Sequence, residues 1–191
     1  MHIYHLVRSQ LLPITQDVAW AFFANPANLQ QLTPEWMQLT DDSPENFKTI
    51  FTGMVQILGL QLPGGLPCQW VSAITHVEAP HYYVEEQKAG PFSFWHHRHQ
   101  IIPTEGGVEI RDTIDYALSF GWLGHWVHNL FIRAQLHDLF DYRARVLEEF
   151  FGTYQPRTWS NADDALEERT GQRPERRRTA KANHLTTPPR F

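Results

Sequence analysis

The sequence has a single cysteine and no long apolar run. Because Cys68 is its one thiol, an internal disulfide and a zinc cluster built from several cysteines are both excluded. No segment approaches the roughly 20 consecutive apolar residues of a membrane span, and the first residues lack the basic-then-apolar order of a signal peptide. These absences predict a soluble, cytoplasmic protein.

Basic side chains are scarce in most of the chain. Residues 1–152 carry eight basic and sixteen acidic side chains, a net charge of −8, whereas residues 153–191 carry eight basic and five acidic ones, a net charge of +3. Proteins that bind nucleic acid usually present a basic face to the phosphates. The acidic body therefore argues against nucleic acid as the main partner.

Apolar residues become rare after Phe151. The remaining stretch is rich in charge, Thr, Asn and Pro, and it cannot bury enough surface to offset its ordering entropy. We expect residues 152–191 to be a mostly disordered charged tail. Residues 1–151 are expected to form one domain, large enough to bury about two thirds of its unfolded surface.

The hydrophobic pattern of the body changes twice. An extended segment, HIYHLVRSQLLPI, precedes a short helix at 16–24 capped by Thr15 and a second one that begins at Asn25-Pro26. Period-two runs then fill residues 36–120, interrupted by Gly and Pro turns, and predict about six further strands in an antiparallel meander. From Gly121 to Gly152 the period is helical, which predicts one long helix of roughly 25 to 28 residues. The six runs are WMQLT, FKTIFTGMVQILGLQL, PCQWVSAITHVE, YYVEEQK, FSFWHHRHQII and VEIRDTIDYALSF.

Several short motifs occur in a characteristic order along residues 1–151. They are Asn25-Pro26-x-Asn28-Leu29 with Leu32-Thr33-Pro34, Leu66-Pro67 with Trp70 and Ile74, Gln87 with Gly90-Pro91-Phe92, Trp95 with His97 and His99, Asp112 with Tyr116, and Leu139-Phe140-Asp141-Tyr142-Arg143. This order resembles the START/polyketide cyclase-like superfamily, also called SRPBCC. It is most similar to a bacterial branch of uncharacterised ligand-binding proteins that are sometimes labelled cell division inhibitor.

The resemblance implies an α+β helix-grip fold. In that fold a curved antiparallel sheet, here of about seven strands, wraps around a long C-terminal helix, with two short helices after the first strand. A cavity between sheet and helix holds an apolar or amphipathic small molecule in this superfamily. Fold alone does not choose among its many ligands.

Three histidines lie within four positions of one predicted strand. Because alternate residues of a strand share a face, His97 and His99 point to one side together with Trp95 and Ile101. A hairpin closing at 104–107 would pair His99 with Asp112. A register shifted by two residues would instead oppose His97 to that aspartate.

Asp112 lies on an otherwise apolar inward face of the next predicted strand. A buried carboxylate needs a donor to offset its desolvation, and a histidine is the obvious one. The cluster then either satisfies the aspartate and fixes the sheet, or orients a ligand's polar group in a cavity with aromatic walls. Glu85 and Gln87 on the neighbouring strand extend the polar lining in the second interpretation. The predicted ligand-binding residues are Trp70, Trp95, His97, His99, Asp112, Tyr116, Gln87 and Glu85.

Metal binding is another interpretation of the histidines. His97-x-His99 has metal-ligand spacing, but its distances from Gly90 and Glu105 and the long terminal helix differ from the cupin pattern, so we expect no metal and no other cofactor. For Arg143 we expect a structural ion pair.

Three functions remain open from the sequence. The first is binding of an apolar or amphipathic small molecule without catalysis. The second is a cyclase or dehydratase that uses the His-Asp pair with Tyr116 as acid and base on a polyketide-like substrate. The third is a protein-interaction module, in line with the division-inhibitor label. The sequence does not determine the oligomeric state.

Overall fold

The computed structural model describes residues 2–62, 64–118 and 132–156. Residues 1–154 form one compact unit, which carries all of the helices and strands described below. Residues 157–191 of the predicted disordered tail and the start of the predicted long helix lie outside the described residues. None of the helices in these ranges is both long enough and apolar enough to cross a membrane.

Seven strands form one antiparallel sheet with the order β1-β7-β6-β5-β4-β3-β2. Strands that follow each other in the chain are neighbours from β2 to β7, and β1 closes the order by pairing with β7. The elements are β1 (Tyr4–Leu12), α1 (Gln16–Phe23), the 3₁₀-helices η1 (Pro26–Gln30) and η2 (Glu35–Met37), β2 (Thr40–Asp41), β3 (Val55–Leu62), β4 (Leu66–Glu78), β5 (Tyr82–Ala89), β6 (Phe92–Thr104), β7 (Gly107–Leu118) and α3 (Arg133–Phe151).

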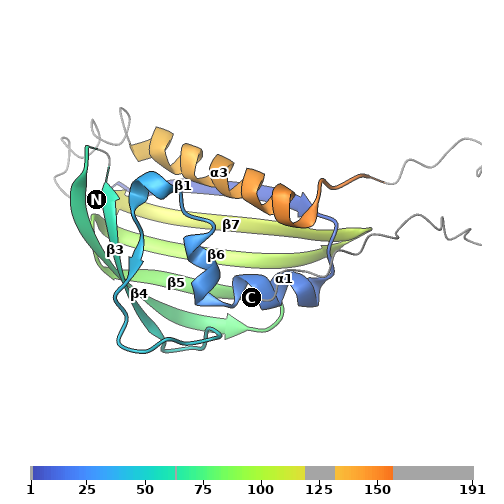
Figure 1. Ribbon diagram of the computed structural model, residues 1–191, viewed down its shortest axis with the longest axis horizontal. Helices are drawn as coiled ribbons and strands as arrows, with labels where there is room; N and C mark the ends of the chain where they lie inside the picture. The colour runs from blue at the N-terminus through green and yellow to red at the C-terminus, as the bar shows by residue number, and fades with distance from the viewer. Residues whose placement is uncertain (1, 63, 119–131, 157–191) are drawn as a thin grey trace, which may run out of the picture. The chain divides into compact units, whose positions relative to one another are not determined.

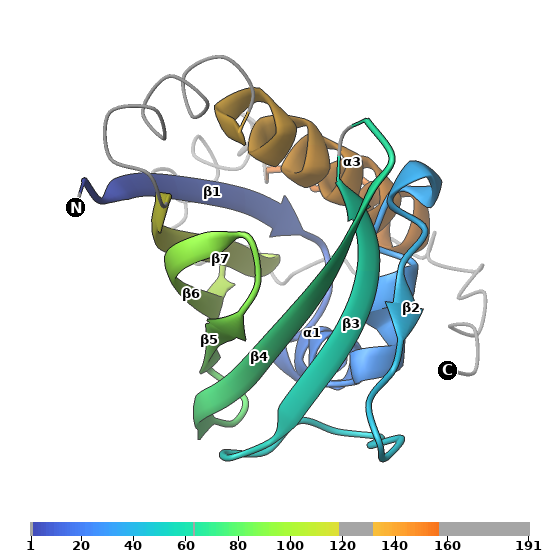
Figure 2. The same cartoon turned by 90° about the vertical axis from the view of Figure 1, so that its left-hand side faces the viewer.

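Helix α3 lies along the concave face of this sheet. Figure 1 shows the helix running lengthwise above β1, β7 and β6, and Figure 2 shows the sheet curling until β1 and β3 approach it from two sides. The predicted α+β helix-grip fold is therefore confirmed. An inward-facing side chain in the middle of the sheet consequently points toward the helix.

Local capping explains where the first helices begin. The Thr15 hydroxyl accepts a hydrogen bond from the Val18 amide (3.3 Å), and Asp17 stands in the first turn of α1, as the sequence predicts. Asn25 caps the next segment through the Ala27 amide (3.2 Å). This second segment is a 3₁₀-helix, a tight form that proteins use in short pieces.

Two parts of the predicted strand pattern are wrong. The run at 36–40 forms η2 and contributes only its last residue to the two-residue strand β2. The run at 47–62 becomes a strand only from Val55 onward. Before that point Ile50 and Met54 pack against Ile74 while the backbone follows a loop, in which the Ile50 amide donates to the Ala24 carbonyl (2.8 Å). The buried side chains of this loop therefore produce the same alternating pattern as a strand.

The apolar interior contains two clusters that α3 covers at different turns. One cluster packs Leu147 against Leu12, Phe22, Ile101, Val108 and Ile110. The other packs Leu136 and Phe140 against Leu6, Trp95, Ile114 and Tyr116. The inward residues between these clusters on β1, β6, β7 and α3 are polar, and they form the candidate site.

Candidate ligand-binding site

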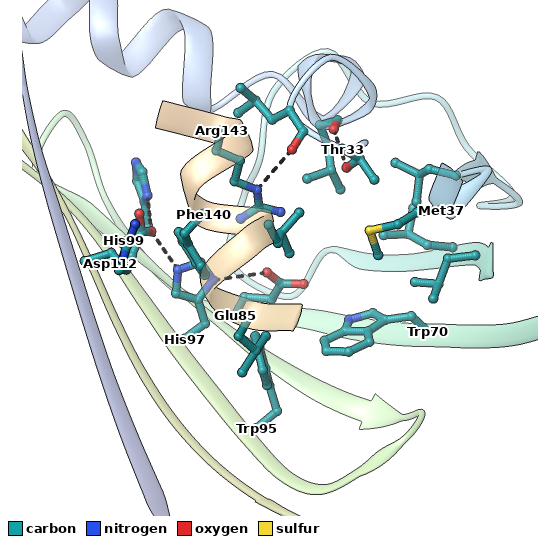
Figure 3. A pocket seen from close by; sticks show the side chains of 18 of the residues that line it. Thr33, Met37, Trp70, Glu85, Trp95, His97, His99, Asp112, Phe140 and Arg143 are labelled. Carbon is teal, nitrogen blue, oxygen red and sulfur yellow. Dashed lines mark hydrogen bonds and ion pairs between the residues drawn. The ribbon is translucent and has the colours of Figure 1, made fainter. Parts of the chain in front are cut away.

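A cavity of about 890 Å³ lies between the sheet and α3. Protein interiors rarely contain voids larger than a water molecule, whereas ligand pockets measure roughly 300–1,000 Å³. Most of its wall is apolar, and Figure 3 shows Trp70, Trp95 and Phe140 bordering the space. The rings of Trp70 and Trp95 pack edge to face, with their centroids 5.1 Å apart. Such a cavity suits an apolar or partly apolar molecule.

A row of polar side chains runs across the sheet on the wall of this cavity, from one strand to the next. Arg8, Asp112, His99 and Tyr83 lie opposite one another on β1, β7, β6 and β5, because each is the register partner of the next. His97 and Glu85 form the adjacent pair on β6 and β5. We call this set the polar belt: Arg8, Gln10, Tyr83, Glu85, His97, His99, Asp112 and Arg143, all of which line the cavity.

Asp112 is the centre of the polar belt. Its Oδ1 accepts hydrogen bonds from His97 Nε2 (2.7 Å) and from His99 Nδ1 (2.8 Å). The register that places His99 opposite Asp112 is confirmed, and the alternative register is wrong. His97 reaches the same oxygen diagonally from its place opposite Ile114. Both histidines thus meet the aspartate, as a carboxylate buried at this depth requires.

The second nitrogen of His97 faces another carboxylate. His97 Nδ1 lies 3.8 Å from Glu85 Oε2, so the imidazole stands between two acids (Figure 3). Burial by itself would lower the pKa of His97, but its hydrogen bond to Asp112 and the nearby carboxylate of Glu85 outweigh that effect and raise the pKa to about 9. His97 is therefore an imidazolium at neutral pH.

Both acids are held in their charged form by the same contacts. Burial would raise the pKa of Asp112, but the two histidines lower it well below its usual range. Burial acts in the same direction on Glu85, whose pKa is nevertheless lowered, mainly by His97 with smaller contributions from Ser72 and Arg143. The cavity therefore contains fixed charges of both signs within an apolar wall, where they interact more strongly than in water.

His99 is enclosed by aromatic rings. Phe23 and Tyr83 lie against it, with ring centroids at 4.5 Å and 4.9 Å. Its Nε2 is buried and has no hydrogen-bond partner among the described residues. In this arrangement His99 orients Asp112 through Nδ1, while His97 and the carboxylates form the more open part of the polar belt.

Comparison with known proteins supports the architecture and nothing finer. No family model matches the sequence, and no curated protein matches it. A putative uncharacterized protein from Rhizobium leguminosarum aligns with a TM-score of 0.59 and 16% identity over 78% of this chain and 96% of its own. Norcoclaurine synthase from Thalictrum flavum, a point mutant in complex with a transition-state analogue, aligns at 0.56 and 16% identity over 78% and 96%. Ara h 8.0201 aligns at 0.53 and 13% identity over 78% and 99%.

The chain has a helix-grip fold like that of these solved structures. At these identities the structural likeness establishes the fold alone. The narrower resemblance to the bacterial branch labelled cell division inhibitor stays a prediction.

Six of the eight predicted ligand-binding residues line the cavity of this helix-grip domain. They are Trp70, Glu85, Trp95, His97, His99 and Asp112. Gln87 does not line the cavity. Its Nε2 donates to the Phe92 carbonyl (2.7 Å) and its Oε1 accepts from the Phe92 amide (3.4 Å), which closes the turn between β5 and β6. Tyr116 is 3% exposed and packs in the apolar cluster against Tyr4, Phe92 and Trp95.

The donor atoms of His97, His99 and Asp112 lie within 4.8 Å of one another, close enough to hold a metal ion. However, both imidazoles already donate to the same aspartate oxygen. A metal would have to displace the protons that both imidazoles share with this oxygen. The geometry is that of a hydrogen-bonded acid–imidazolium cluster.

For Arg143 the ion pair expected from the sequence is wrong. Within the described ranges it forms no ion pair; its Nε donates to the Leu32 carbonyl (3.1 Å) and its guanidinium lies 5.1 Å from the centroid of Phe140. A signal was present, because Leu136, Phe140, Arg143 and Leu147 recur at helical spacing and share the inward face. A cation on that face needs an acceptor, just as Asp112 on its strand needs a donor.

Proposed function

We propose that this protein binds an apolar or amphipathic small molecule in the cavity between the sheet and α3. The observation that carries the proposal is the hollow of about 890 Å³ at the place where most domains of this size have a packed core. Leaving such a space unfilled forfeits dispersion and burial energy, which a bound apolar molecule would restore. The polar belt would orient the polar end of that molecule.

A cavity-filling variant tests this proposal. Leu58 on β3 is 6% exposed and lines the cavity, so Leu58→Trp places an indole inside it. Val55 lies on the same strand with its side chain 45% exposed, and Val55→Trp adds the same ring outside. The probe is N-phenyl-1-naphthylamine, a neutral fluorophore that brightens in apolar surroundings.

We expect the wild type and Val55→Trp to bind the fluorophore with the same affinity and Leu58→Trp to bind it at least tenfold more weakly. Thermal melting of each variant checks that it is folded. Equal binding by all three folded proteins, or no binding by the wild type, would contradict the proposal. Native mass spectrometry of the purified wild type adds an independent observation, because a co-purifying molecule would identify the natural ligand.

One observation favours a second candidate function, a cyclase or dehydratase reaction in the same cavity. His97 is a buried imidazolium held by Asp112 and bordering the space a substrate would occupy. With its pKa raised to about 9 it is suited to donate a proton at neutral pH, as a general acid does. Turnover of a polyketide-like substrate that disappears in His97→Ala and Asp112→Asn would support catalysis. If the protein only binds its ligand, neither the wild type nor either variant shows turnover.

A further inference from the structure

We propose that Arg143 binds the carboxylate of an amphipathic acid whose apolar part fills the cavity; this inference rests on the proposed function and names its ligand class. Arg143 lies on the inward face of α3 between Phe140 and Leu147, and its side chain lines the cavity (Figure 3). It is thus a permanent cation in a largely apolar space.

Among the described residues, every charged side chain of the polar belt except Arg143 contacts a group of opposite charge. Glu85 and Asp112 flank His97, and Arg8 bonds Asp141 and His137. The structure gives Arg143 a single hydrogen bond, from Nε to the Leu32 carbonyl, and no carboxylate within ion-pair distance among the described residues. A guanidinium has five N–H donors and keeps its charge in proteins, so its two terminal nitrogens need acceptors from the contents of the cavity.

The existing contacts of Arg143 also fix its orientation. The Nε hydrogen bond holds one edge of the guanidinium, and the Phe140 ring lies 5.1 Å from its central carbon. The terminal nitrogens then remain as a preorganised fork, whose spacing matches the two oxygens of a carboxylate. Holding this group in place beforehand reduces the entropy cost of binding.

The neighbouring charges favour a monoanionic group over an amine or a dianion. An amine would meet the positive charge of Arg143, whereas a phosphate dianion would be repelled by Glu85 and Asp112 on the opposite wall with a single unpaired cation to hold it. A monoanion with an apolar tail satisfies the guanidinium and the apolar wall together. Glu85 and Asp112 remain paired with His97.

Two probes of equal chain length test the assignment, dodecanoic acid and 1-dodecanol, each displacing N-phenyl-1-naphthylamine at pH 7.5 below its aggregation limit. Arg143→Gln removes the charge, and Arg145→Gln is the matched control because Arg145 is exposed on the same helix and does not line the cavity. We expect the wild type and Arg145→Gln to bind dodecanoate at least tenfold more tightly than dodecanol. Arg143→Gln should lose about ten- to a hundredfold for dodecanoate and keep its affinity for dodecanol.

The outcomes separate this inference from the proposed function. If dodecanol and the fluorophore bind the wild type while dodecanoate binds no more tightly, the cavity binds ligands and the role of Arg143 is refuted. Parallel loss of both probes in Arg143→Gln refutes it as well, because a structural role would weaken both. Failure of the wild type to bind any of the three probes overturns the proposed function and this inference together. Arg143→Lys keeps the charge without the fork, and we expect it to retain part of the preference for dodecanoate.

Discussion

Replacing Asp112 with asparagine should flatten the pH dependence of stability on the alkaline side of neutrality. His97 has its pKa raised from 6.5 to about 9 in the folded protein, chiefly by Asp112 and Glu85 against the effect of burial. A group whose folded pKa is raised stabilises the protein fully below its unfolded pKa, and this contribution disappears as the pH rises through the folded pKa. The window for His97 is therefore pH 6.5 to 9.

The magnitude follows from the same rise in pKa. At 1.36 kcal/mol per pH unit, a rise from 6.5 to about 9 corresponds to about 3 kcal/mol of unfolding free energy that the wild type loses across the window. Asparagine retains an acceptor oxygen but has no charge, so only Glu85 would still favour the imidazolium. We expect the loss in Asp112→Asn to fall to about half of the wild-type value or less.

Urea unfolding followed by tryptophan fluorescence at pH 6.0 to 9.5 measures the effect. Asp115→Asn is the matched control, because Asp115 is on the same strand and its partner His5 (2.6 Å) is exposed, where ion pairs contribute little. The control should follow the wild-type curve. Identical curves for the wild type and Asp112→Asn would refute the reasoning, as would an NMR titration in which His97 of the wild type ionises near pH 6.5.

Two further predictions concern the frame that holds the site. Gly107→Ala should destabilise the protein by about 2 kcal/mol or more, because an added Cβ would overlap the Leu12 carbonyl oxygen; an unchanged urea midpoint would contradict this. Leu147→Ala should cost about 2 to 5 kcal/mol in urea unfolding, since Leu147 is 4% exposed in the core, whereas Leu66→Ala at a side chain 63% exposed should cost far less. Similar losses for both leucines would contradict the described packing.

The hairpin of β6 and β7 shows what local patterns can predict about the site. The turn at 104–107 and the alternation of apolar residues together determine which faces match but leave two registers open, and the observed ladder selects the one that pairs His99 with Asp112. Strand alternation placed His97 and His99 on the same face, so two donors for the aspartate were within reach. Short sequence separation narrowed the choice to two registers, because few registers compete across a two-residue connection.

The errors lie where distant segments meet. The run at 47–54 alternates like a strand, yet its apolar side chains are buried by contacts of Ile50 and Met54 with Ala24 and Ile74, which no local pattern reveals. Arg143 was expected in an ion pair, but its acceptor is a backbone carbonyl more than a hundred residues away in the chain. Composition carries no information about which carbonyl or carboxylate will face a given guanidinium.

The sequence by itself determined the order of strands and helices, the inward faces of β6, β7 and α3, and the need for a partner at Asp112. These are consequences of backbone periodicity and of the cost of burying a charge, both of which act along the chain or on one residue. Only the tertiary structure decided that a hollow of about 890 Å³ remains under α3 and that Arg143 faces it with no carboxylate of the described residues in contact. The size of this cavity depends on the distance between the curved sheet and α3. That distance is set by packing contacts throughout the domain.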